Sequence, residues 1–133
     1  MTKKNVRIFK NKPFDRFARK VALSDKSLCQ AVHDAERGLL AADLGGGVIK
    51  QRVARSGGGK SGGFRTLILF RAGSRAFFVH GFAKNDRDNI DDDELAALRR
   101  LAAILLAYDD AALSQALANK TLTEVTCDEE RLS

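Results

Sequence analysis

The sequence predicts a small α+β domain: a twisted antiparallel sheet with N-terminal helices and a C-terminal helix packed on it. Three runs rich in β-branched and aromatic residues follow one another between Val48 and Phe82, and a short turn joins the last two. Segments with helical spacing of apolar residues lie before and after these runs. The 133 residues are enough for one domain with a substantial core, so residues 1–133 are expected to fold as a unit.

The first part of the chain is expected to form one strand and two helices. Residues 6–9 have the composition of a short strand, and Pro13 fits the first turn of a helix over 13–20. Ser24 or Asp25 is expected to cap a longer helix, which the glycines at 45–47 would end. Apolar residues at steps of four, three and four form one face of this helix: Leu28, Val32, Ala35 and Leu39.

The middle of the chain is expected to supply the rest of the sheet. Strands are predicted over 48–54, 64–70 and 76–82, with a turn at 72–74. The last two strands are apolar on both faces, so they should be central and covered by helices.

The C-terminal part is predicted to be mostly helical. The acidic residues 91–94 place negative charge at a helix start, where the helix dipole favours it. A shorter helix fits 109–118, and a strand fits 122–125. The apolar stripe of the longer helix consists of Leu95, Leu98, Leu101, Leu105 and Tyr108.

The charge is unevenly distributed along the chain. Of the formal net charge of +6, residues 1–87 carry +13 and residues 88–133 carry −7. A basic body with an acidic end is typical of a protein with a nucleic-acid-binding face. The alternative is that the two ends pair across the surface, but the cations cluster with glycines instead of alternating with acids.

Other features exclude several classes of protein. There is no run of about 18 apolar residues, so no membrane span is expected. The N-terminus lacks the apolar segment of a signal peptide. Cys29 and Cys127 lie far apart and match no metal-binding spacing. We therefore expect a cytoplasmic protein with reduced thiols, no cofactor and no metal ion.

The most informative stretch runs from residue 50 to residue 65. It is predicted to form two strands joined by a glycine-rich loop, and it contains five glycines and no carboxylate. Grouped cations repel one another unless an anion binds, and a polyphosphate is the partner that fits. Alternation along a strand would point the first two cations to the same face. The cations are Lys50, Arg52, Arg55, Lys60 and Arg65.

The segment Gly59-Lys60-Ser61 resembles the end of a P-loop, but the rest of the motif is missing. A P-loop requires a glycine five positions before Gly59, where this sequence has Ala54. A P-loop is also followed by a helix, whereas residues 64–70 are strand-like. Nucleoside triphosphate binding is therefore not expected. The loop amides and Lys60 are instead expected to approach phosphates closely.

Two places allow both a structural and a functional interpretation. His80 is expected beside Phe78 and Phe82 on one face of its strand, as a core or half-core residue, and general acid–base chemistry is the alternative. The segment after this strand is either a polar loop before the next helix or a means of bringing Lys84 and Arg87 to the end of the sheet.

Together these motifs resemble the RelE/HigB superfamily of type II toxin–antitoxin toxins. They are the Lys-x-Arg strand pair, the Gly-x-Gly-Lys-x-Gly-Gly-aromatic-Arg loop, and a Phe-rich strand ending in Gly-Phe-Ala-Lys-Asn. The resemblance covers about residues 5–108, which leaves 109–133 as a helical and acidic extension. It implies a microbial-RNase-like fold and cleavage of mRNA on the ribosome, by 2′-hydroxyl attack on the adjacent phosphate without a metal ion.

The resemblance also implies partners. A cognate antitoxin would neutralise the toxin, and relatives of this kind often have antitoxins with a helix-turn-helix DNA-binding domain. The chain would then reach operator DNA only through the antitoxin. The ribosome and mRNA are the other expected partners, and no membrane is expected.

The resemblance assigns residues by motif. Arg65 follows the glycine–aromatic step and is expected to clamp phosphate with its planar guanidinium. Several RelE-type toxins use a tyrosine or histidine near the C-terminal end as acid or base, whereas Tyr108 is expected on a helix stripe. The expected catalytic residues are Arg65, Lys50, Arg52 and Lys84, and the expected RNA-binding residues are Arg55, Lys60, Asn85 and Arg87.

Two other functional classes stay open. One is a ParE-like toxin of the same fold that inhibits DNA gyrase by protein contact, which would not need a dense cation cluster. The other is a nucleic-acid-binding module without catalysis, which would explain the charge equally well.

Overall fold

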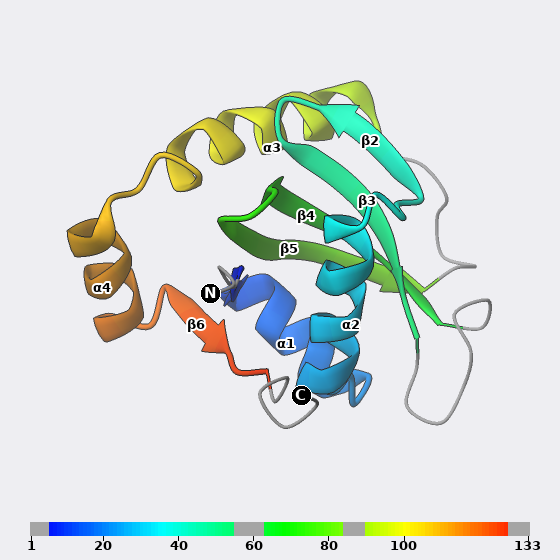
Figure 1. The fold of residues 1–133 in the computed structure, drawn as a ribbon, viewed down its shortest axis with the longest axis horizontal. Helices are drawn as coiled ribbons and strands as arrows, with labels where there is room; N and C mark the ends of the chain where they lie inside the picture. The colour runs from blue at the N-terminus through cyan, green and yellow to red at the C-terminus, as the bar shows by residue number, and fades with distance from the viewer. Residues whose placement is uncertain (1–5, 55–62, 84–89, 128–133) are drawn as a thin grey trace, which may run out of the picture.

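The computed structural model describes residues 6–54, 63–83 and 90–127 (Figure 1). Within these residues the chain forms a six-stranded sheet in the order β2-β3-β4-β5-β1-β6 and four helices. The strands are β1 (Arg7–Asn11), β2 (Ala42–Gly45), β3 (Val48–Val53), β4 (Phe64–Arg71), β5 (Arg75–Ala83) and β6 (Leu122–Val125). The helices are α1 (Lys12–Lys20), α2 (Asp25–Glu36), α3 (Asp92–Leu105) and α4 (Asp110–Ala118).

This architecture confirms the predicted α+β class, and the sheet is mostly antiparallel. One pairing departs from the expectation, because β1 runs parallel to β5, with Ile8 opposite Ala76 and Phe9 opposite Phe77. The long chain segment between β1 and β5 makes the parallel arrangement possible, since parallel neighbours need a crossover connection. β1 therefore lies between β5 and the C-terminal strand β6.

The central strands β4 and β5 separate two cores, as their apolar sequences predict. Ile68 and Phe78 belong to one core, which α1 and α2 cover. Leu69 and Phe77 belong to the other, into which α3 places Ala102. All four strand residues have no exposed surface. We call the two sides of the sheet the α1/α2 face and the α3 face.

The end of α2 differs from the prediction. The helix ends at Glu36 instead of continuing to the glycines at 45–47. Gly38 has a φ of +82°, and the Leu39 amide donates to the Asp34 carbonyl at 2.9 Å, which closes the helix. Leu39 is 53% exposed, so its helical spacing did not reflect a buried face. Residues 42–45 form β2, which pairs with β3 and was not predicted.

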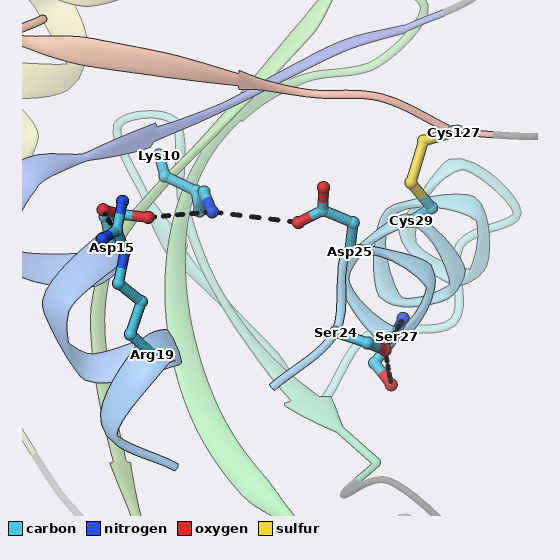
Figure 2. A network of polar contacts seen from close by, with 8 residues as sticks. All are labelled: Lys10, Asp15, Arg19, Ser24, Asp25, Ser27, Cys29 and Cys127. Atoms are coloured by element: carbon cyan, nitrogen blue, oxygen red, sulfur yellow. Dashed lines mark hydrogen bonds and ion pairs between the residues drawn. A yellow bond between two sulfur atoms is a disulfide. The ribbon is translucent and has the colours of Figure 1, made fainter. Parts of the chain in front are cut away.

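The two cysteines also correct the sequence-based expectation of reduced thiols. Cys29 of α2 and Cys127, which follows β6, form a disulfide with their Cα atoms 6.0 Å apart (Figure 2). Their 98-residue separation gave no sign of this proximity. It arises because α2 packs against the sheet beside β6.

A polar network connects β1 to both N-terminal helices (Figure 2). Lys10 Nζ lies 3.0 Å from Asp15 Oδ1 and 3.8 Å from Asp25 Oδ1. Arg19 Nε lies 3.0 Å from the other oxygen of Asp15. The hydrogen bond from Lys10 lowers the pKa of Asp15, although partial burial of the carboxyl group acts in the opposite direction.

No single helix in the described part of the chain is long and apolar enough to cross a membrane. Only α3 and α4 taken together have the length and apolar composition of a membrane span, and the two helices are bent by 112° relative to each other.

The lowered pKa of Asp15 predicts how stability depends on pH. Because the folded-state pKa lies below the unfolded one, the ionised carboxylate stabilises the fold above about pH 4, and this contribution is lost as pH falls further. Asp15→Asn should therefore lower the melting temperature at pH 7, and the difference from the wild type should shrink towards pH 3. Thermal unfolding across this range measures it.

Asp25→Asn is the matched control, because its contact with Lys10 is longer and it is exposed. It should lower the melting temperature less. A loss for Asp15→Asn that is equally large at pH 3 and pH 7 would contradict the ionic contribution.

Candidate nucleic-acid interface

Three predicted cations lie together on the α3 face of the sheet. In the antiparallel β3–β4 pair, Arg52 is directly opposite Arg65, and Lys50 is directly opposite Leu67. Residues directly opposite each other project from the same face. Leu67 belongs to the core on the α3 face, and Lys50 and Arg52 are two residues apart on their strand, so all three cations share that face. We call Lys50, Arg52 and Arg65 the basic patch.

The backbone beneath the basic patch is held by buried hydrogen bonds. Gln51 lies between Lys50 and Arg52, points to the opposite face and is only 5% exposed. Its side-chain amide donates to the carbonyl oxygens of Ala31 at 3.0 Å and Leu39 at 2.9 Å. These bonds tie β3 to α2 and to the segment that follows it. The strand that carries Lys50 and Arg52 is therefore fixed in position by these hydrogen bonds.

A bulge in β5 places His80 on the same face as the patch. The register between β4 and β5 shifts by one residue: Ile68 is opposite Phe78, but Leu67 is opposite His80, which leaves Val79 as the extra residue. Strict alternation from Phe78 would have kept His80 on the α1/α2 face. The bulge reverses this, because an extra residue shifts every later side chain to the other face.

The residues after His80 confirm this orientation. Phe82 is directly opposite Arg65. A side chain at Gly81 would meet the ring of Phe17 of α1 at 2.4 Å, so Gly81 faces α1. Its neighbours His80 and Phe82 therefore face the other way. The expectation that Phe78, His80 and Phe82 share one face was wrong, because no local pattern in the sequence reveals the bulge.

The site consists of two adjacent rows across three strands. One row is Arg52, Arg65 and Phe82, and the next is Lys50, Leu67 and His80. Arg52 is exposed, whereas Arg65, Lys50 and His80 are half-buried. The sequence analysis kept acid–base chemistry as the alternative for His80 but did not place it beside the cations, because the bulge that does so leaves no local sequence pattern.

The electrostatics of the patch favour an anionic ligand. Like charges directly opposite each other destabilise a sheet, yet Arg52 faces Arg65. Within residues 6–54, 63–83 and 90–127, no carboxylate forms an ion pair with either arginine. An anion such as a phosphate would relieve the repulsion and could be bound by both guanidinium groups.

The remaining predicted site residues are not placed by the structure. Arg55, Lys60, Lys84, Asn85 and Arg87 lie outside the described residues. Gly63, which precedes β4, comes so close to β3 that a Cβ there would lie 2.1 Å from the Val53 carbonyl oxygen. The two strands therefore stay in contact up to the residue before Phe64.

Tyr108 does not belong to the site. It is half-buried against the core on the α3 face, and its carbonyl accepts a hydrogen bond from Arg75 at 2.6 Å. Arg75 is the first residue of β5, whereas Phe82 lies near the other end of that strand. Among the described residues, no three His, Cys, Asp or Glu side chains are grouped closely enough to hold a metal ion.

The opposed arginines predict an unusual stability effect. Arg52→Gln should leave the fold at least as stable as the wild type, with a gain of up to about 1 kcal/mol at low salt, because it removes a like-charge pair. The gain should shrink as salt screens the repulsion. Urea unfolding at low and high ionic strength measures both effects.

Arg7→Gln is the matched control on β1, away from the basic patch. Arg7 pairs with Glu124 at 2.9 Å, so its replacement should be neutral or destabilising, and salt should reduce any loss. A clear destabilisation by Arg52→Gln would show that Arg52 supports the fold and would contradict the interpretation as a ligand-binding cation.

Comparison with known proteins identifies the family. A family model described as the RelE toxin of the RelE/RelB toxin–antitoxin system matches residues 6–125, which include all the described strands and helices from β1 to β6. No curated protein gives a match. The resemblance seen in the glycine-rich loop and its flanking strands is thus confirmed at the level of RelE, and it implies a cognate antitoxin as partner. The chain belongs to the RelE toxin family of toxin–antitoxin systems.

Proposed function

We propose that this toxin is an endoribonuclease that cleaves mRNA on the ribosome and so blocks translation. The observation that carries the proposal is the pair of rows on the α3 face, where two arginines oppose each other beside a lysine and a histidine. This group has the components that RNA cleavage needs: cations for the phosphate and side chains that can exchange protons.

The reaction begins when the ribose 2′-hydroxyl attacks the adjacent phosphorus. The bond to the 5′-oxygen of the next nucleotide then breaks, which leaves a cyclic phosphate and a free 5′-hydroxyl. Negative charge accumulates on the phosphate oxygens in between. Arg65 and Arg52 lie side by side on neighbouring strands, so both guanidinium groups can donate hydrogen bonds to this charge.

Proton transfer is assigned to the second row. His80 on β5 and Lys50 on β3 flank Leu67 on β4, so their Cα atoms lie two strand spacings apart, about 10 Å. Attacking and leaving oxygens lie on opposite sides of phosphorus in such a reaction. Side chains on either side of β4 match this requirement: the neutral imidazole of His80 takes the proton of the 2′-hydroxyl, and the Lys50 ammonium protonates the leaving oxygen.

The ribosome supplies the positioning that this small site lacks. Two rows on a sheet can hold one phosphate, but they do not bend a nucleotide for in-line attack. Lys84 is proposed to assist at the phosphate. Arg55, Lys60, Asn85 and Arg87 are proposed to hold the RNA backbone. The antitoxin is proposed to carry a helix-turn-helix domain that binds operator DNA.

Arg65→Ala tests the phosphate clamp. Single-turnover cleavage of mRNA on programmed ribosomes should slow by about a thousandfold, because one preorganised donor to the developing charge is lost. Arg71→Ala is the matched control, since Arg71 is an exposed arginine at the other end of β4, and it should cleave at the wild-type rate.

Thermal unfolding of both variants checks that they are folded. Wild-type rates for a folded Arg65→Ala protein would remove Arg65 from the site. Rapid cleavage of naked mRNA by the wild type would contradict the dependence on the ribosome. Inhibition of DNA gyrase without any RNA cleavage would support the ParE-like alternative instead.

His80→Gln tests the proton-transfer assignment. The cleavage rate should fall by about 10²- to 10⁴-fold. As the proposed base, His80 should make cleavage by the wild type slow down towards acid pH, and this dependence should be absent in the variant. His33→Gln is the control, because His33 is the other histidine of the chain and lies on α2, on the opposite side of the sheet. An unchanged pH profile in His80→Gln would show that His80 does not exchange the proton.

A further inference from the structure

The disulfide joins two elements that differ greatly in how firmly they are held. Cys29 lies within α2, which buries six residues and receives the hydrogen bond from Gln51 of β3. Cys127 follows β6, a strand of four residues at the edge of the sheet. In β6, only Leu122 and Val125 are buried.

In the described part of the chain β6 contacts one strand, β1, and the helices α1, α2 and α4. It pairs with β1 alone, and its ion pair between Glu124 and Arg7 is exposed, so that pair contributes little. A short edge strand with two buried side chains belongs to the least stable parts of a fold. α2, in contrast, is capped at its first turn by Ser24, whose hydroxyl accepts a hydrogen bond from the Ser27 amide at 3.1 Å (Figure 2).

We infer that Cys29 and Cys127 form a redox-dependent latch that determines whether β6 stays docked on the sheet. When the latch is closed, the disulfide holds the end of β6 against α2. When both thiols are reduced, β6 separates from β1 far more often, whereas α2 remains in place. The conclusion does not depend on the proposed RNase activity.

The exposure of the two sulfurs indicates how the latch closes and opens. Cys29 is buried with 6% exposure, and Cys127 is half-buried, so a small disulfide such as oxidised glutathione meets Cys127 first. The Cys127 thiolate forms a mixed disulfide and releases one glutathione thiolate. The Cys29 thiolate then attacks the Cys127 sulfur and releases the second, so two protein thiols are oxidised and one glutathione disulfide is reduced. Excess reduced thiol reverses both steps.

The latch acts at the edge of the sheet opposite the basic patch. The sheet order places β6 beyond β1, whereas the patch lies on β3 and β4. Opening should therefore change the stability and local opening of the C-terminal part more than the geometry of the patch. Closing a loop of 98 residues constrains the unfolded chain strongly, so the stabilisation should be large.

Hydrogen exchange tests the latch directly. The oxidised wild type, the same protein in excess dithiothreitol, and a Cys29→Ser/Cys127→Ser variant are compared. Amides of residues 122–125 should exchange at least tenfold faster in the reduced protein and in the variant, whereas amides of β4 should change little. The melting temperature should fall by on the order of 10 °C on reduction. Dithiothreitol should have no effect on the variant.

Comparing the wild type with and without reductant tests the latch even if the double variant does not fold. Alkylation followed by mass measurement after equilibration in glutathione buffers reports how much disulfide is present. Free thiols in oxidising buffer would overturn the inference. Equal exchange of residues 122–125 in the oxidised and reduced wild type would overturn it as well.

Discussion

Burial of both faces of the β4–β5 pair governs the rest of this structure. Ile68 and Phe78 point to one side and Leu69 and Phe77 to the other, and none of them has exposed surface. Apolar surface on both sides of a sheet must be removed from water on both sides, and helices before and after the strands provide this cover. The arginines of this strand pair lie only near the strand ends, and Arg65 of the basic patch lies near one of them.

The β-bulge at Val79 determines whether the basic patch has a histidine beside it. Without it, His80 would point into the side covered by α1 and α2, and the α3 face would carry only cations. With it, the imidazole of His80 on β5 lies on the same face as the cations of β3 and β4. Bulges often occur beside functional sites because one extra residue redirects a side chain without disturbing the strands on either side.

The proposed RNA-cleaving site and the proposed disulfide latch lie at different parts of the sheet. The proposed RNA-cleaving rows lie on β3, β4 and β5, where Gln51 and Gly63 hold the strands in position. The disulfide and the Lys10 network lie around β1, β6 and the starts of α1 and α2 (Figure 2). The two regions share α2, whose packing against β3 supports one and whose Cys29 anchors the other.

Local sequence determined most of the elements. Alternation, helical spacing and capping involve only near neighbours in the chain. They predicted the first strand, the two strands of the central hairpin, the helices after Asn11 and Asp91, and the short strand at 122–125. The shared face of Lys50 and Arg52 follows from the same alternation. The family, too, could be recognised from the glycine loop and its flanks.

Only the tertiary structure decided the features that depend on segments far apart in the chain. The parallel β1–β5 pair, the early end of α2 beside the strand β2, and the proximity of Cys29 and Cys127 all arise from packing between distant elements. The face of His80 was misjudged for a related reason. A strand's alternation reports the face of each residue only while the register is unbroken, and the partner strand, not the local sequence, sets where it breaks.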